Sequence, residues 1–135
     1  MALNRIFITD AEGKSFEETT MKNLAPNLVR QRVIIEGTTE KIVKPVQMKR
    51  YLAKLSKVLN MKALRKPFAY KAEDKGWGGW IHWITSGAHF YSYTSSPPLF
   101  TVDAYTCKPF SVEKAVAFTK KFLKAKEIVW KDIEI

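Results

Sequence analysis

The sequence contains one cysteine, two histidines and no long apolar segment among its 135 residues. A single cysteine, Cys107, excludes an internal disulfide, as is usual for proteins of a reducing compartment. His82, His89 and Cys107 are too few and too scattered to predict a structural zinc site. No apolar run reaches the ~20 residues of a membrane-spanning helix, and no secretion-signal segment follows Met1. We therefore expect a cytoplasmic protein that holds no metal and does not enter a membrane.

Acidic residues are also scarce. The chain has 13 Asp and Glu against 23 Lys and Arg, which gives a formal net charge of +10. Residues 28–76 hold most of the excess, because they carry 13 basic and four acidic residues. A basic layer attracts anions such as phosphates, nucleotides or nucleic acid. A solvated lysine surface explains the same composition, and no nucleic-acid-binding motif accompanies the charge.

Apolar periodicity predicts the secondary structure. Alternation at every second residue indicates strands, and apolar residues three or four apart indicate helices. We predict strands over residues 5–9, 28–37, 63–72, 78–96, 99–107 and 127–135, and helices over residues 46–60 and 111–124. Pro45 and Ser111 are suited to the two helix N-termini. Residues 16–24 are predicted to be irregular or a short helix.

The order of elements indicates the fold class. From residue 28 onward the order is strand, helix, strand, strand, strand, helix, strand. This order is typical of an α/β two-layer sandwich, in which two helices cover one face of a mostly antiparallel sheet. The opposite face then needs cover, and a second copy of the chain is the usual solution. We therefore expect a homo-oligomer, either a dimer or a trimer.

The stretch from Gly78 to Lys108 is the centre of the predicted sheet. Its two alternating runs are separated by Pro97 and Pro98 and are rich in aromatic and β-branched residues. Such rings can stack on adenine or face a sulfonium through cation–π attraction, worth roughly 0.5–2 kcal/mol. Packing within the sheet core is the commoner explanation for any single ring.

Two segments of this stretch resemble a known family. Residues 86–94 (S-G-A-H-F-Y-S-Y-T) and 102–107 (V-D-A-Y-T-C) are similar to the core of the small prokaryotic S-adenosylmethionine decarboxylases. The motif of that family is glutamate-serine-histidine, a second histidine four residues later, and an aspartate strand that ends in threonine-cysteine. The resemblance covers residues 28–130 and implies the same two-layer sandwich. It makes residues 1–27 an added N-terminal arm and residues 28–135 a single domain.

The sequence departs from this motif at three positions. Gly87 stands at the glutamate, Ala88 at the serine and Tyr93 at the second histidine. In the family the chain cuts itself before the serine, which becomes a pyruvoyl cofactor. Ala88 has no hydroxyl and cannot form this group, which the decarboxylation needs as its electron sink. We therefore expect an unprocessed chain, with no cofactor and no decarboxylase activity.

The resemblance also implies which residues carry chemistry. His89 matches the motif histidine, Cys107 matches the proton-donating cysteine, and Tyr93 replaces the second histidine. We take these three as the candidate catalytic residues. The candidate ligand-binding residues are Glu36, Ala88, Tyr91 and Asp103. A hydrogen-bonded strand histidine and a small apolar cysteine are the structural alternatives.

Two functions from different classes fit this pattern. In the first, an enzyme keeps the adenosyl ligand and changes the reaction. S-adenosylmethionine can break without a cofactor when its carboxylate displaces methylthioadenosine and leaves homoserine lactone, a step that needs orientation and desolvation. In the second, a non-catalytic homologue binds the ligand as a sensor or regulatory subunit. S-adenosylmethionine is itself cationic, so a phosphate-bearing adenosyl derivative suits a chain of charge +10 better.

Overall fold

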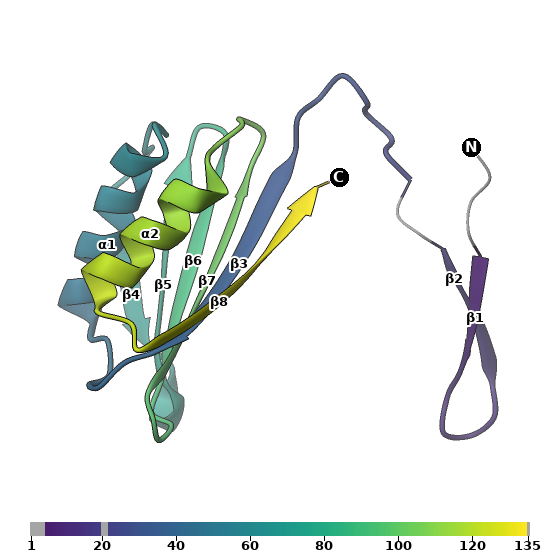
Figure 1. The fold of residues 1–135 in the computed structure, drawn as a ribbon, viewed down its shortest axis with the longest axis horizontal. Helices are drawn as coiled ribbons and strands as arrows, with labels where there is room; N and C mark the ends of the chain where they lie inside the picture. The colour runs from purple at the N-terminus through teal and green to yellow at the C-terminus, as the bar shows by residue number, and fades with distance from the viewer. Residues whose placement is uncertain (1–4, 20–21, 135) are drawn as a thin grey trace.

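The computed structural model describes residues 5–19 and 22–134, and its main body is an α/β two-layer sandwich (Figure 1). The elements of this body are β3 (Gln31–Thr38), α1 (Pro45–Val58), β4 (Phe68–Lys71), a 3-10 turn (Glu73–Lys75), β5 (Gly76–Trp83), β6 (Ser86–Tyr93), β7 (Leu99–Thr106), α2 (Val112–Leu123) and β8 (Glu127–Glu134). The six strands form one sheet in the order β4-β5-β6-β7-β3-β8, and every neighbouring pair is antiparallel. Both helices cover the same face of the sheet. The predicted fold class is therefore confirmed.

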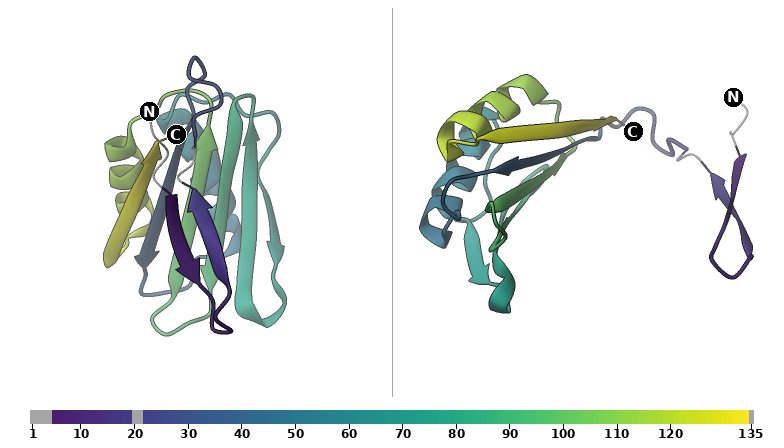
Figure 2. Two further views of the ribbon diagram at one scale, coloured as in Figure 1. Left: turned by 90° about the vertical axis from the view of Figure 1, so that its right-hand side faces the viewer. Right: turned by 60° about the horizontal axis from the view of Figure 1, so that its bottom comes forward.

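The N-terminal segment forms a separate hairpin. β1 (Arg5–Thr9) pairs antiparallel with β2 (Ser15–Thr19), and Figure 2 shows the pair apart from the six-stranded sheet. The Asp10 carboxylate accepts hydrogen bonds from the backbone N–H groups of Glu12 and Lys14, which closes the turn. The prediction of an irregular or helical segment was wrong for residues 16–19, because β1 supplies their hydrogen-bonding partner. Residues 20–21 of that prediction lie outside the described residues.

The predicted strand over residues 78–96 is in fact two strands. β5 and β6 are joined by a two-residue turn at Ile84 and Thr85, so the sheet has one more strand than the sequence predicted. Both turn residues are β-branched and favour strands, so the turn has no glycine or proline signal. The next residue, Ser86, adopts the left-handed φ of +129°. The chain therefore reverses here without turn-forming side chains, and Ser86 adopts a strained backbone conformation at the end of the turn.

Other boundaries differ from the predictions by a few residues. The predicted strand over residues 63–72 is reduced to β4, and Ala63 forms only an isolated bridge with Trp83. Pro67 directly precedes β4, where its missing N–H costs no ladder hydrogen bond. The N-cap role of Ser111 is confirmed, because its hydroxyl accepts a hydrogen bond from the backbone N–H of Lys114 at 3.2 Å.

The core lies between the sheet and the two helices. The apolar spacing that predicted a helix over residues 46–60 forms its buried face: Met48, Tyr51, Leu52, Leu55 and Leu59 are buried and Val58 is half-buried. The Tyr51 ring lies edge-on to Phe90 at 5.1 Å between centroids, and its hydroxyl forms a 2.7 Å hydrogen bond with that of Thr119. Burial raises the pKa of Tyr51, so this hydroxyl stays protonated. No helix in the described ranges has the length and apolar character that crossing a membrane requires.

Candidate ligand-binding site

The sheet face opposite the helices presents a concentration of exposed rings. Along β3, β6 and β7 every second residue is buried against the helices, so the residues between them point to the other side. We call this side the open face. Its exposed aromatic residues are Phe68, Tyr70, Trp80, Tyr91 and Tyr93. Exposed rings gathered on one face are typical of a binding surface rather than of a core.

The register of the strands aligns open-face residues in rows that run across neighbouring strands. Phe68, Trp80, His89 and Asp103 are successive partners across β4, β5, β6 and β7. Trp80 also contacts His82 edge-on, with 5.3 Å between ring centroids. The sheet therefore brings two histidines, a tryptophan and a carboxylate together from three different strands.

A glycine makes a hollow in the adjacent row. His82, Gly87 and Tyr105 are partners across β5, β6 and β7, and Gly87 has no side chain to fill the space between its neighbours. A pocket of about 460 Å³ lies here, which we call the open-face pocket. Its lining residues are Trp80, Ile81, His82, Ser86, Gly87, Ala88, His89, Asp103 and Tyr105.

The position of Gly87 is closed to any side chain. A Cβ atom built there would lie 2.4 Å from the backbone oxygen of Ile81, well inside van der Waals contact. Gly87 stands where the resembling family has its glutamate. In this chain that position requires glycine for reasons of packing, independently of the alanine that follows it.

The carboxylate of the pocket is already neutralised. Arg32 donates from Nε and from one terminal nitrogen to the two oxygens of Asp103, at 2.8 and 2.6 Å. These hydrogen bonds and the charge of Asp103 raise the pKa of Arg32. The pair is partly exposed, so its net contribution to stability is about 0–1 kcal/mol. Its main effect is to hold Asp103 in place and to remove negative charge from the pocket.

Tyr91 lies beside the pocket, where its ring stacks on that of His89, a lining residue. The two rings are nearly parallel, at 14°, with 6.2 Å between their centroids. Burial raises the pKa of Tyr91, and the neighbouring Tyr70 raises it further. The Tyr91 hydroxyl therefore remains protonated at neutral pH and can donate a hydrogen bond to a ligand.

The structure brings together part of the predicted site. Ala88, His89 and Asp103 line the open-face pocket, and Tyr91 stacks on His89 beside it. Cys107 is not among the lining residues, but its Sγ is 3.8 Å from the Oγ of Ser86, which is.

Two predicted residues lie elsewhere on the open face. Tyr93 is four residues farther along β6 than His89 and pairs with Leu99. Glu36 on β3 pairs with Thr101. Neither residue lines the open-face pocket.

Three residues near the pocket, Ser86, Trp80 and His82, are not among the predicted site residues. Ser86 was inside the motif segment, but its contact with Cys107 depends on the unpredicted β5–β6 turn. The motif positions do not include Trp80 or His82, whereas both line the pocket. The signal that could have found them is the shared alternation of β5 and β6, which places His89 opposite Trp80.

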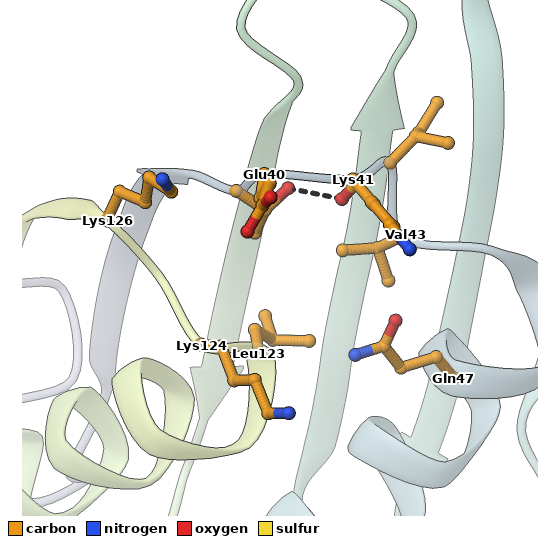
Figure 3. A pocket seen from close by; sticks show the side chains of 9 residues that line it. Glu40, Lys41, Val43, Gln47, Leu123, Lys124 and Lys126 are labelled. Carbon is orange, nitrogen blue, oxygen red and sulfur yellow. Dashed lines mark hydrogen bonds between the residues drawn. The ribbon is translucent and has the colours of Figure 1, made fainter.

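One group of basic residues lies on α1, on the side of the sheet that the helices cover. The outer face of α1 presents four exposed basic residues, Lys49, Arg50, Lys54 and Lys57. A further pocket, of about 340 Å³, lies where the β3–α1 and α2–β8 connections meet, with Lys41, Lys124 and Gln47 in its wall (Figure 3). In the described part of the chain, no group of three or more His, Cys, Asp or Glu residues is arranged to hold a metal ion.

Comparison with known proteins agrees with the fold. The family model described as S-adenosylmethionine decarboxylase matches residues 32–134. Among solved structures, the adenosylmethionine decarboxylase from Aquifex aeolicus VF5 is 20% identical with a TM-score of 0.62. That match covers 79% of this chain and 90% of the other. No curated protein sequence matches the chain.

Proposed function

Because the chain belongs to the S-adenosylmethionine decarboxylase family, we propose that it binds S-adenosylmethionine, or a phosphate-bearing adenosyl derivative, in the open-face pocket and cleaves it as a cofactor-independent lyase. One observation carries the proposal. The motif positions His89 and Asp103 line a ring-rich pocket, while alanine occupies the position of the family's serine.

The proposed reaction is an intramolecular displacement. A carboxylate oxygen of the ligand attacks its own γ-carbon, the carbon–sulfur bond breaks, and the bonding pair goes to sulfur. The products are neutral methylthioadenosine and homoserine lactone. Charge and protons balance without an added base, electron sink or water, so the step needs only a folded-back, desolvated ligand.

The open-face pocket offers groups suited to this task. The exposed face of Trp80 can stack on adenine, and an aromatic face near a sulfonium stabilises it by roughly 0.5–2 kcal/mol. His89 and Tyr91 can orient the ligand by hydrogen bonds. Asp103 is held by Arg32 and so can accept a hydrogen bond from a ribose hydroxyl without moving.

A ligand sensor or regulatory subunit is the alternative function. The observation that favours it is that two of the three candidate catalytic residues, Tyr93 and Cys107, do not line the pocket. Binding of an adenosyl ligand without any product would select this alternative over the lyase.

We expect the purified chain to be unprocessed. Ala88 supplies no nucleophile, so intact-mass measurement should find one polypeptide of about 15.5 kDa. Two fragments split at Gly87–Ala88 would contradict this prediction. Ser86 does carry a hydroxyl, which lies near Cys107, so a split before Ser86 is the other cleavage to look for. It would contradict the prediction equally. A Ser86→Ala variant distinguishes the two sites, because it abolishes only the second cleavage.

We also expect the chain to form a homo-oligomer. Val129 on β8 is 63% exposed and lies on the open face opposite Glu36, on the same side of β8 as the half-buried Ile133. Covering such a face against a second copy is the usual solution for a sheet with helices on one side. Light scattering at micromolar concentration should give a dimer or trimer, and Val129→Lys should shift it toward monomer. A wild-type monomer at that concentration would refute the expectation.

A further inference from the structure

A second pocket adjoins the open-face pocket and adds positive charge to it. This pocket has a volume of about 440 Å³ and is lined by Arg65, Lys66, Phe68, Trp80 and His82. Trp80 and His82 line both pockets, so the two meet at these rings. We call the second one the cationic pocket. A ligand that stacks on Trp80 therefore has the cationic pocket within reach.

The cations of this pocket are carried on an anchored segment. Leu64 donates a backbone hydrogen bond to the carbonyl oxygen of His82 at 2.8 Å, and Ala63 forms a bridge with Trp83. These two contacts tie the segment between α1 and β4 to β5. Arg65 and Lys66 follow directly and are exposed beside the rings.

Among the described residues, no carboxylate neutralises these two cations. Neither Asp nor Glu lines the cationic pocket. Within the described ranges, Arg65 and Lys66 form no ion pair with a carboxylate. The ion pair that the structure shows there joins Arg32 to Asp103. Since Asp103 is already neutralised, the two pockets together are net positive. S-adenosylmethionine, which is itself cationic, gains nothing from this charge.

We propose that Arg65 and Lys66 bind a phosphate group of the ligand whose adenosyl part occupies the open-face pocket. A phosphate-bearing derivative of the adenosyl ligand then binds more tightly than S-adenosylmethionine, which still enters the open-face pocket. This inference rests on the proposed function, because it takes the open-face pocket to be the adenosyl site. A guanidinium beside an ammonium is suited to phosphate, since the planar fork of arginine binds two oxygens at once.

The first test compares ligands that differ by one phosphate. Calorimetry on the wild-type protein at low ionic strength should use adenosine, its 2′-, 3′- and 5′-monophosphates, and inorganic phosphate. We expect at least one monophosphate to bind about tenfold or more tightly than adenosine, as expected for a charged hydrogen bond. This gain should shrink as salt is added, because the cations are exposed.

The second test removes the two charges. In the double variant Arg65→Gln/Lys66→Gln, the monophosphate should lose its advantage while adenosine binds as before. Lys71→Gln is the matched control, because Lys71 lies on β4, is exposed and lines neither pocket. The control should retain the full advantage of the monophosphate.

The outcomes separate this inference from the proposed function. Adenosine that binds as tightly as all three monophosphates overturns the phosphate assignment and leaves the adenosyl site standing. Inorganic phosphate that binds as tightly as the best monophosphate also overturns it, because the anion site would then be independent of the adenosyl group. An adenine oligonucleotide that binds far more tightly than any mononucleotide would assign the face to single-stranded nucleic acid instead. Failure of every adenosyl compound to bind refutes both proposals.

Discussion

Replacing Trp80 by alanine should weaken the binding of methylthioadenosine about 5- to 150-fold, because stacking of a base on an aromatic ring is worth about 1–3 kcal/mol. Trp80 lines both pockets and is 37% exposed, so its ring can be reached by a ligand. Calorimetry with the wild type and the variant measures the difference directly.

The control for this prediction is Trp130→Ala. Trp130 is 54% exposed on β8 and lines neither the open-face pocket nor the cationic pocket. Its removal should leave the affinity for methylthioadenosine unchanged. Equal affinities of wild type and Trp80→Ala would show that the adenosyl group is bound elsewhere.

Replacing Phe90 by alanine should lower the free energy of unfolding by about 3–5 kcal/mol, the usual cost of removing a buried aromatic side chain. Phe90 is fully buried, contacts Tyr51 edge-on and stacks against Phe100 at 5.9 Å between centroids. Because residues alternate along β6, the burial of Phe90 is also what turns His89 and Tyr91 toward the open face.

Urea unfolding followed by circular dichroism tests this second prediction. Val129→Ala serves as the control, because Val129 is 63% exposed and its truncation in the monomer should change stability by about 0.5 kcal/mol or less. Both variants should be compared under conditions in which they have the same oligomeric state. A loss of less than about 1 kcal/mol in Phe90→Ala would mean that the core does not fix the orientation of β6.

The sequence predicted the fold because burial in this chain is strongly periodic. Buried residues recur at helical spacing along α1 and at every second position along β7. Both patterns arise because the sheet is covered by helices on one face and open on the other. The β5–β6 turn was missed because Ile84 and Thr85 favour strands and because its strain is carried by Ser86. Local propensity indicated a strand there, and the tertiary structure imposed a turn.

The candidate site was only partly predictable, because it is assembled by strand pairing. The motif led to Ala88, His89 and Asp103, which lie on neighbouring strands. The ion pair of Asp103 with Arg32 joins residues 71 positions apart, and sequence alone does not indicate it. Likewise, Arg65 reaches the site only because the segment before β4 is tied to β5.

The most direct test of the proposed lyase is incubation of the purified protein with S-adenosylmethionine, followed by chromatography and mass analysis of the products. S-adenosylmethionine also breaks down slowly in solution, so parallel samples without protein and with heat-denatured protein set the background. The same incubation with Trp80→Ala tests whether turnover depends on the open-face pocket. We predict methylthioadenosine and homoserine lactone in equal amounts, above background with the wild type and strongly reduced with the variant. Release of carbon dioxide with decarboxylated S-adenosylmethionine, or no product above background, would contradict the proposal.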